Sequence, residues 1–115
     1  MSWLIVGVGF AGAALMYALR AGGSKMSSTQ IQAQLAAGAV VLDVRTPEEV
    51  ATGAYPGALT IPVQQLAARI KEVPTGKPVV VYCAAGARAG TAAEMLRAAG
   101  HAEVYNAGGL KDMPR

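Results

Sequence analysis

The residues with the clearest chemical potential gather in one short segment around Cys83, the only cysteine in the sequence. Ahead of it, the apolar and β-branched run Val79 to Tyr82 predicts a central parallel strand that is covered on both faces. After it, residues 87–99 predict a helix that Gly100 closes. We therefore expect Cys83 at the carboxyl end of a strand, directly before the N-terminus of a helix.

The loop that follows Cys83 has the composition of an anion-binding turn. Its four residues carry almost no side chain, so the backbone can curl tightly and point its N–H groups inward, beside the positive end of the helix dipole. A thiolate is such an anion, and this field is expected to make Cys83 a nucleophile at neutral pH, with Arg88 adding a full positive charge. The alternative is a small buried hydrophobe, and the loop chemistry favours the reactive thiol. The loop residues are Ala84, Ala85, Gly86 and Ala87.

Two charged residues lie at the carboxyl end of another predicted strand, which spans residues 39–44. Residues 46–49 combine an N-cap threonine, a proline at the first helical position and a capping-box glutamate, so a short helix is expected directly after Arg45. Asp43 and Arg45 therefore lie at a strand's carboxyl end, where open α/β sheets place their sites. The alternative is an ordinary surface ion pair.

These motifs resemble those of a known protein family. The segment Cys83-Ala-Ala-Gly-Ala-Arg88 resembles the Cys-x-x-Gly-x-Arg active-site loop of the rhodanese family, the thiosulfate and related sulfurtransferases. The resemblance covers about residues 27–110. One departure is Ala54, which replaces a histidine that is usual in the family. The segment from Asn106 to Asp112 is most similar to that of small phage-shock type single-domain rhodaneses. Three further segments are similar to family motifs in the same order: Leu42 to Glu49, Gly53 to Ala58 and Tyr105 to Leu110.

The resemblance implies a three-layer α/β sandwich with a central, mostly parallel sheet flanked by helices. It also implies a two-step transfer in which Cys83 takes the outer sulfur of a donor such as thiosulfate, and a thiol or cyanide acceptor then removes it. The loop amides and Arg88 are expected to hold the leaving sulfite and the persulfide. Asp43 is expected to be a structural acceptor, and Arg45 a support or a substrate contact. No metal or organic cofactor is implied.

Two other functions are compatible with a lone cysteine in such a loop. The related cysteine phosphatases place five residues between cysteine and arginine, whereas this sequence has four between Cys83 and Arg88, which should make the loop too tight for a tetrahedral phosphate. The other is a non-catalytic binding module or carrier that holds a persulfide for a partner at the membrane. The presence of both Cys83 and Arg88 favours a catalytic role over a binding module or carrier.

Length and composition limit the remaining possibilities. The 115 residues have room for one compact domain, expected over residues 26–115, after an N-terminal segment of residues 1–25. A net charge of +3, with one Phe and one Trp, provides neither the basic patch nor the stacking surface of a nucleic-acid-binding protein. One cysteine excludes an internal disulfide framework, and the sole histidine, His101, is expected to be a solvated turn residue rather than a metal ligand.

Residues 3–19 form an apolar run of 17 residues without a charge, at the lower edge of the ~17–25 that a membrane-spanning helix needs. They predict a single-pass anchor. Arg20 and Lys25 follow the run, and this charge asymmetry places the domain on the cytoplasmic side. The alternative is a signal peptide cleaved near residues 21–23, which would make the domain periplasmic or exported.

Within this run, Gly7 to Gly12 fits the Gly-x-Gly-x-x-Gly fingerprint of dinucleotide-binding folds. The acidic residue that should bind the ribose is missing, because none occurs before Asp43, and the remaining chain is too short for that fold. We interpret the glycines as part of a membrane helix, in which Gly9 and Ala13 can bring two copies into contact as a dimer.

The other elements follow from local patterns. Ser27 and Gln30 resemble a capping box that opens a short helix ended by Gly38. Residues 59–61 predict a short strand, 63–73 a helix and 103–105 the last strand. On the helix after the cysteine loop, the residues expected to face the core are Ala92, Met95, Leu96 and Ala99.

Overall fold

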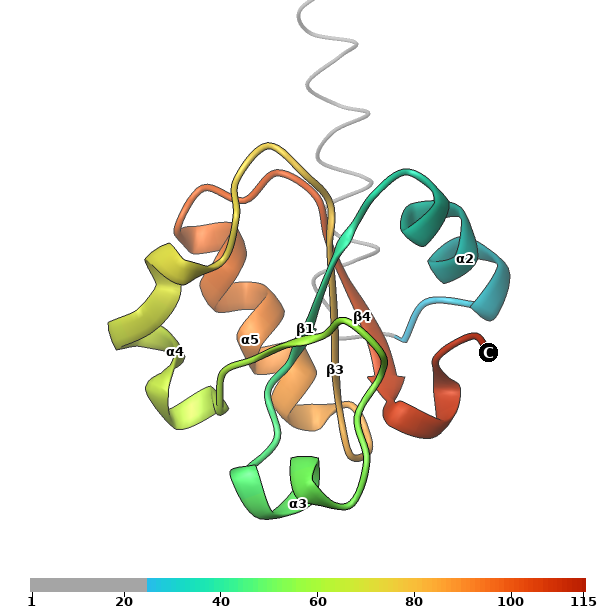
Figure 1. The fold of residues 1–115 in the computed structure, drawn as a ribbon. Helices are drawn as coiled ribbons and strands as arrows, with labels where there is room; N and C mark the ends of the chain where they lie inside the picture. Colours follow the sequence, from blue (N-terminus) through green and yellow to red (C-terminus); the bar gives the residue numbers. More distant parts are fainter. Residues whose placement is uncertain (1–24) are drawn as a thin grey trace, which may run out of the picture.

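Four parallel strands form the centre of the fold in the computed structural model, which describes residues 25–115 (Figure 1). Their spatial order is β2-β1-β3-β4, and each neighbouring pair runs in parallel. β3 pairs with β1 on one side and β4 on the other, so the predicted central strand is confirmed. The strands are β1 (Val40–Asp43), β2 (Leu59–Thr60), β3 (Val79–Cys83) and β4 (Val104–Gly109).

Helices cover both faces of this sheet (Figure 1). On one face lie α4 (Val63–Arg69), which a 3₁₀ turn extends over Ile70–Glu72, and α5 (Ala87–Ala98). On the other lie α2 (Ser28–Ala36) and the C-terminal 3₁₀ turn η2 (Leu110–Asp112). The short α3 (Pro47–Ala51) follows the carboxyl end of β1. This is the predicted three-layer α/β sandwich with a parallel sheet.

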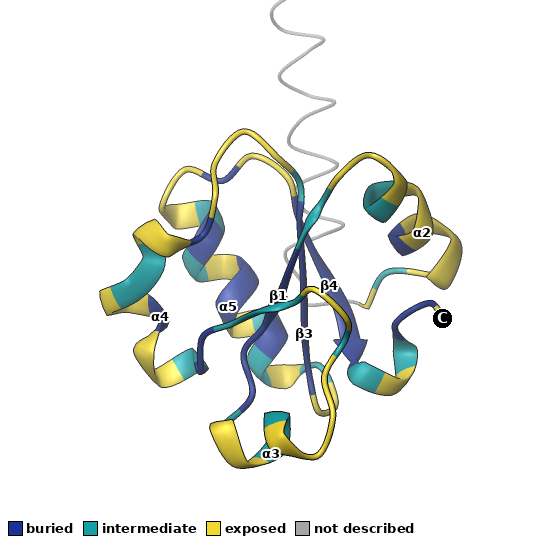
Figure 2. Ribbon diagram, viewed as in Figure 1, coloured by how far each residue is buried: buried dark blue, intermediate teal, exposed yellow. Residues whose placement is uncertain are grey.

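Alternate residues of β3 face opposite hydrophobic clusters, as the two-residue period of a strand requires. Val79, Val81 and Cys83 belong to the cluster under α4 and α5, whereas Val80 and Tyr82 belong to the cluster under α2. All five residues of β3 are buried, and Figure 2 shows the inner strands as the most deeply buried part of the fold. Cys83 therefore ends a strand that is held from both sides.

The predicted helix starts are confirmed in detail. Ser27 and Gln30 form a reciprocal capping box at α2, and Thr46 and Glu49 form another at α3, each with both of its hydrogen bonds. Such boxes satisfy backbone N–H groups that a helix leaves unpaired at its N-terminus. The second box fixes the turn of the chain after β1. This turn lies at the carboxyl edge of the sheet, which also carries the site.

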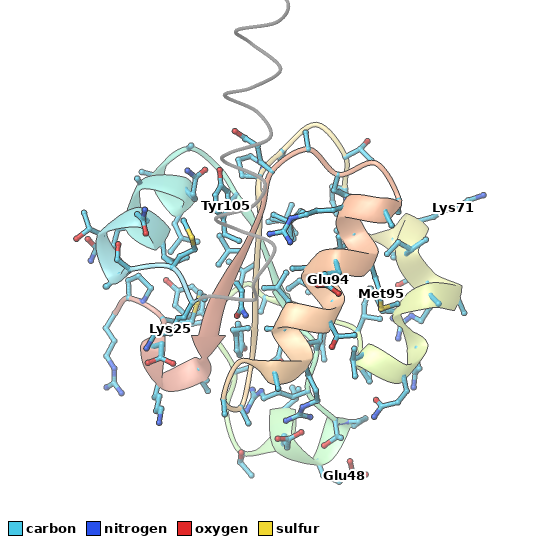
Figure 3. The ribbon with its side chains drawn as sticks, turned by 180° about the vertical axis from the view of Figure 1, so that it is seen from behind. Lys25, Glu48, Lys71, Glu94, Met95 and Tyr105 are labelled. Carbon is cyan, nitrogen blue, oxygen red and sulfur yellow. The ribbon has the colours of Figure 1, made fainter. Side chains whose placement is uncertain are left out.

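At the C-terminal end of α5, Ala99 and His101 are not placed as the sequence predicted. Ala99 is exposed. Met95 is half-buried toward α4, and Glu94 points outward (Figure 3). The residues of α5 that face the sheet are Ala89, Ala92, Ala93 and Leu96. Our prediction of Ala99 in the core is wrong because the helix ends at Ala98.

The prediction of a solvated His101 is also wrong, since only 8% of this residue is exposed. Gly100 has a φ of +103°, and it turns the chain so that the His101 N–H donates to the Leu96 carbonyl at 3.0 Å. With the bond from Gly100 N–H to the Arg97 carbonyl, this makes a Schellman motif, which folds the residue after the glycine back onto the helix.

Two N-terminal predictions concern residues that the structure does not describe. The anchor at residues 3–19 and the dimer contact through Gly9 and Ala13 both lie outside residues 25–115. Among the described residues, none of the helices has the length and apolar character needed to cross a bilayer.

Candidate active site

Cys83 is the last residue of β3, and only 1% of it is exposed. Its Sγ accepts a hydrogen bond from the backbone N–H of Gly86 at 2.9 Å. Gly86 has a φ of +112°, a left-handed conformation that glycine adopts without steric cost, and this lets the loop curl back over the sulfur. The predicted loop of small residues therefore points one of its amides at the thiol.

The N-terminus of α5 lies directly after this amide. Gly86 is the N-cap residue, and Ala87 begins a helix of 12 residues. The first N–H groups of a helix have no carbonyl one turn earlier to bind, and together with the helix dipole they favour an anion at this end. Ala84, Ala85 and Ala87 are exposed above the buried sulfur, so the loop residues predicted from sequence lie together around Cys83.

The carboxyl end of β4 supports the loop from the other side. Gly109 is the strand partner of Cys83, and a side chain there would overlap the Ala84 carbonyl group, whose carbon would lie 3.0 Å from the added Cβ. Asn106 donates through Nδ2 to the Gly86 carbonyl at 3.1 Å and accepts the Gly108 N–H at 2.8 Å. The Gly86 residue is thus held by its N–H and its carbonyl. Sequence reasoning gave Asn106 no role, although an asparagine two residues before a Gly-Gly pair, within a segment similar to a family motif, is a usable signal.

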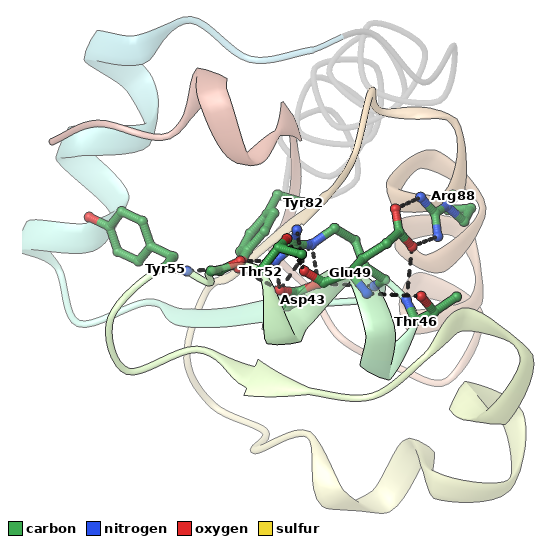
Figure 4. Close-up of polar contacts among 9 residues, drawn as sticks. Asp43, Thr46, Glu49, Thr52, Tyr55, Tyr82 and Arg88 are labelled. Carbon is green, nitrogen blue, oxygen red and sulfur yellow. Dashed lines mark hydrogen bonds and ion pairs between the residues drawn. The ribbon is translucent and has the colours of Figure 1, made fainter.

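Arg88 is bound to a residue that the sequence analysis described only as a helix cap. Its Nη1 and Nη2 donate to the two carboxylate oxygens of Glu49 at 2.6 and 2.9 Å, as Figure 4 shows. The Arg88 hydrogen bonds, and then the Thr46 N–H, lower the pKa of Glu49 to about 2. In return, these bonds are the main cause that raises the pKa of Arg88. The positive charge at the end of the loop is therefore positioned by α3.

Asp43 and Arg45 form a buried pair, so the alternative of an ordinary surface ion pair is wrong. Asp43 is fully buried and Arg45 is 5% exposed. Arg45 donates to the Asp43 carboxylate through Nε at 3.0 Å and Nη2 at 2.8 Å, and the Tyr82 hydroxyl donates to it at 2.6 Å. Burial by itself would raise the pKa of Asp43, but the hydrogen bonds from Arg45 and Tyr82 lower it.

The same network holds the segment that follows α3. Arg45 Nη2 donates to the Gly53 carbonyl at 2.7 Å. The Tyr55 N–H donates to the Tyr82 hydroxyl at 2.9 Å (Figure 4). The Arg45 guanidinium also lies 5.4 Å from the centre of the Tyr82 ring. Because protein groups occupy the guanidinium, the geometry favours support over substrate contact for Arg45.

The site therefore gathers at the carboxyl edge of the sheet, where the ends of β1, β3 and β4 meet. It offers a single thiol under a backbone amide and a helix N-terminus, with an arginine nearby, an arrangement that can bind and react with an anion. Within residues 25–115, no group of three or more His, Cys, Asp or Glu side chains is placed to hold a metal ion.

Residues 27–113 match the family model of the rhodanese-like domain, so the chain belongs to the rhodanese family. It is 42% identical over 74 residues to thiosulfate sulfurtransferase PspE of Escherichia coli, covering 63% of this chain and 71% of that protein. It is 33% identical over 104 residues to human thiosulfate:glutathione sulfurtransferase, covering 77% and 90%.

Two further proteins are similar to this chain. The chain is 46% identical over 74 residues to the uncharacterised protein YqhL of Bacillus subtilis, covering 64% of this chain but only 59% of that protein's length. The structure of the human single-domain sulfurtransferase TSTD1 superimposes with a TM-score of 0.59 and 30% identity, covering 76% of this chain and 92% of that one. The α/β fold with a four-stranded parallel sheet is thus the fold of these rhodanese-like neighbours.

Proposed function

We propose that this protein is a sulfurtransferase that carries sulfane sulfur on Cys83 from a donor such as thiosulfate to a cyanide or thiol acceptor. The hydrogen bond from the Gly86 N–H to Cys83 Sγ, at the N-terminus of α5, carries this proposal because it is an interaction that favours a thiolate. Family membership and the names of the relatives, which include thiosulfate sulfurtransferases, support sulfur transfer in general.

In the first step, the Cys83 thiolate attacks the outer sulfur of thiosulfate. The S–S bond of thiosulfate breaks, its electron pair leaves with sulfite, and the outer sulfur remains on Cys83 as a persulfide anion. The amides of residues 84–88 and the N-terminus of α5 stabilise the negative charge that moves through this site. Arg88, positioned by Glu49, adds a cation at the edge of the loop.

In the second step, the acceptor attacks the sulfane sulfur of the persulfide. The persulfide S–S bond breaks, and Cys83 departs as a thiolate that keeps the electron pair. Cyanide becomes thiocyanate, and a thiol that has lost its proton to solvent becomes a persulfide. The enzyme returns to its starting state with no net oxidation or reduction of the protein.

Purified full-length protein, supplied with thiosulfate and cyanide, tests this function. Catalytic formation of thiocyanate is expected. A persulfide that forms on Cys83 but is not turned over by cyanide or thiols would instead support a carrier that delivers sulfur to a partner. Absence of both persulfide and thiocyanate would contradict the proposal.

On sequence grounds we also propose that residues 3–19 anchor the domain in a membrane, with the domain on the cytoplasmic side. The full-length protein is then expected in the membrane fraction after an alkaline carbonate wash. A small membrane-impermeant thiosulfonate reagent should react with Cys83 only after lysis. Reaction in intact cells, or a mature N-terminus near Ser24, would place the domain on the exported side.

A further inference from the structure

The two residues that lead into the domain, Lys25 and Met26, lie along the outer edge of β4. Among the strands of the described residues, β4 pairs only with β3, so it is an edge strand of the sheet. The Met26 N–H donates to the Asn106 carbonyl at 2.8 Å and so pairs a group that an edge strand leaves open. The match to the rhodanese-like domain begins at residue 27, so these two residues precede the part of the chain that the family model covers. We call Lys25 and Met26 the N-terminal strap.

The side chain of Lys25 covers the end of β4. Its Nζ pairs with Asp112 at 3.2 Å, and Figure 3 shows Lys25 beside η2. Its alkyl chain lies across Gly108, where an added Cβ would be 3.0 Å from Lys25 Cγ and 2.5 Å from Cδ. Asp112 in turn accepts the Gly109 N–H at 2.8 Å. Both glycines at the end of β4 are therefore in contact with Lys25 or with its ion-pair partner.

The strap binds β4 at the residues that support the cysteine loop. The side chain of Asn106 donates to the Gly86 carbonyl at 3.1 Å, and the Gly86 N–H donates to Cys83 Sγ at 2.9 Å. Gly109 is the strand partner of Cys83 and lies against the carbonyl of Ala84. A continuous series of contacts therefore runs from the strap through β4 to the amide on the sulfur.

Three contacts of different kinds hold the strap at one strand end. The ion pair of Lys25 and Asp112 contributes little by itself, because these side chains are 56% and 23% exposed. The backbone hydrogen bond of Met26 and the packing of the Lys25 chain on Gly108 act at the same place. A hydrogen bond weakens steeply as its angle departs from the optimum, so a small shift of this strand end is enough to weaken the Gly86 bond to sulfur.

We propose that Lys25 and Met26 are positioning residues for the nucleophile. The strap fixes the end of β4, and β4 holds the Gly86 N–H on the sulfur of Cys83. The proposal rests on the proposed role of Cys83 in sulfur transfer, and it assigns a part in the reactivity of this thiol to residues that precede the family match.

The rate at which a small thiosulfonate reagent modifies Cys83 in the full-length protein tests the proposal, because this is the only cysteine in the sequence. Lys25→Ala/Met26→Pro removes the ion pair, the packing and the N–H donor. We expect it to slow modification at neutral pH about three- to tenfold, as weakened hydrogen bonding to the sulfur predicts. The amide exchange of Gly86, measured by NMR, should become faster.

Two single substitutions are the controls. Lys25→Arg keeps the charge and a long alkyl chain and should behave as the wild type. Lys71→Ala removes a positive charge from the 3₁₀ turn on the opposite face of the sheet, and it should also leave both measurements unchanged. None of these variants alters Arg88, Glu49 or Asp43, the charged residues at the carboxyl edge of the sheet.

A purely structural role for the strap predicts a change of the opposite sign. Loosening of the domain would expose a sulfur that is now buried and would speed its modification. A modification rate that is unchanged or faster in the double variant therefore overturns the proposal, as does unchanged exchange at Gly86. Thermal unfolding shows whether that variant folds, and if it does not, Lys25→Ala alone should slow modification to a smaller extent.

These measurements need neither thiosulfate nor cyanide. Slower modification of the strap variants supports the positioning role even if the wild type forms no thiocyanate, a result that would count against the sulfurtransferase function alone. Thiocyanate formation by a protein whose thiol reacts equally fast with and without the strap contacts would overturn the positioning role alone.

Discussion

At the scale of single residues, Glu49 joins two parts of the site with one carboxylate. It accepts a hydrogen bond from the Thr46 N–H at 3.0 Å, which caps α3, and it accepts hydrogen bonds from both Nη1 and Nη2 of Arg88. The cap could be predicted because its partners are three residues apart in the sequence. The pairing with Arg88 could not, because 39 residues separate the two and only the fold brings them together.

Substitution of Arg88 by alanine should slow sulfur transfer by about tenfold or more, because a charge contact at a partly desolvated anion contributes roughly 1.5–3 kcal/mol. The measurement is kcat/KM for thiocyanate formation. Glu49→Gln, which keeps Arg88 but weakens its anchor, should cause a smaller loss. An unchanged rate in Arg88→Ala would mean that the loop amides alone stabilise the reacting anion.

The carboxylate of Glu49 should titrate near pH 2, well below its ordinary value of 4.5, because Arg88 and Thr46 donate to its charged form. A depressed pKa stabilises the folded state above the unfolded value, and this contribution is lost as the pH falls from about 4.5 through about 2. NMR titration of the side-chain carboxyl carbons measures this directly.

Arg88→Ala should move the Glu49 titration back toward the ordinary range. The control is Glu72, whose pKa is lowered by Arg69 and which should be unaffected by that substitution. A Glu49 titration that does not change between wild type and Arg88→Ala would show that the ion pair does not form in solution.

At the scale of elements, the sequence signals differ in how local they are. β3 and the two capped helix starts were predictable, because a β-branched run and a capping box are complete within a few residues. β4 was predicted to end at Tyr105 but continues to Gly109. Its second half has no β-branched residues, and its conformation comes from pairing with β3 and from contact with the cysteine loop.

Gly109→Ala should slow sulfur transfer strongly, because its new Cβ would push against the carbonyl of Ala84 and displace the loop above Cys83. The backbone φ of −102° at this position is normal for alanine, so the effect is steric. Kinetics and thermal unfolding should be measured together.

Gly76→Ala is the matched control for this substitution. Gly76 has a φ of +79° and open space around it, so alanine there should lower stability through backbone strain without slowing transfer. Equal transfer rates for Gly109→Ala and the wild type would contradict the role of β4 in shaping the loop.

At the scale of the whole molecule, the buried pair of Asp43 and Arg45 ties together segments far apart in the sequence. The strand-end position of both residues was predictable from the pattern around β1. Their burial and their contacts with Tyr82 and Gly53 depend on which face of β3 the tyrosine takes and on the path of the chain after α3. Those are tertiary features with no local signal.

Asp43→Leu should destabilise the protein by about 3–5 kcal/mol, because it leaves the Arg45 guanidinium buried without its partner. Urea unfolding measures the loss. Arg69→Gln, which breaks the exposed pair with Glu72, is the control and should cause a much smaller change. Equal losses in the two variants would contradict the bracing role of the buried network.

The most direct test of the account is to find where the sulfur goes. After incubation with thiosulfate, mass spectrometry of the full-length protein should show a gain of one sulfur atom, located on the peptide that contains Cys83. Cys83→Ser should stay folded, since the hydroxyl is close in size to the thiol, but should gain no sulfur and form no thiocyanate, because a serine hydroxyl is not ionised in this loop. Sulfur transfer by Cys83→Ser at the wild-type rate, or sulfur carried on another peptide, would contradict the persulfide mechanism.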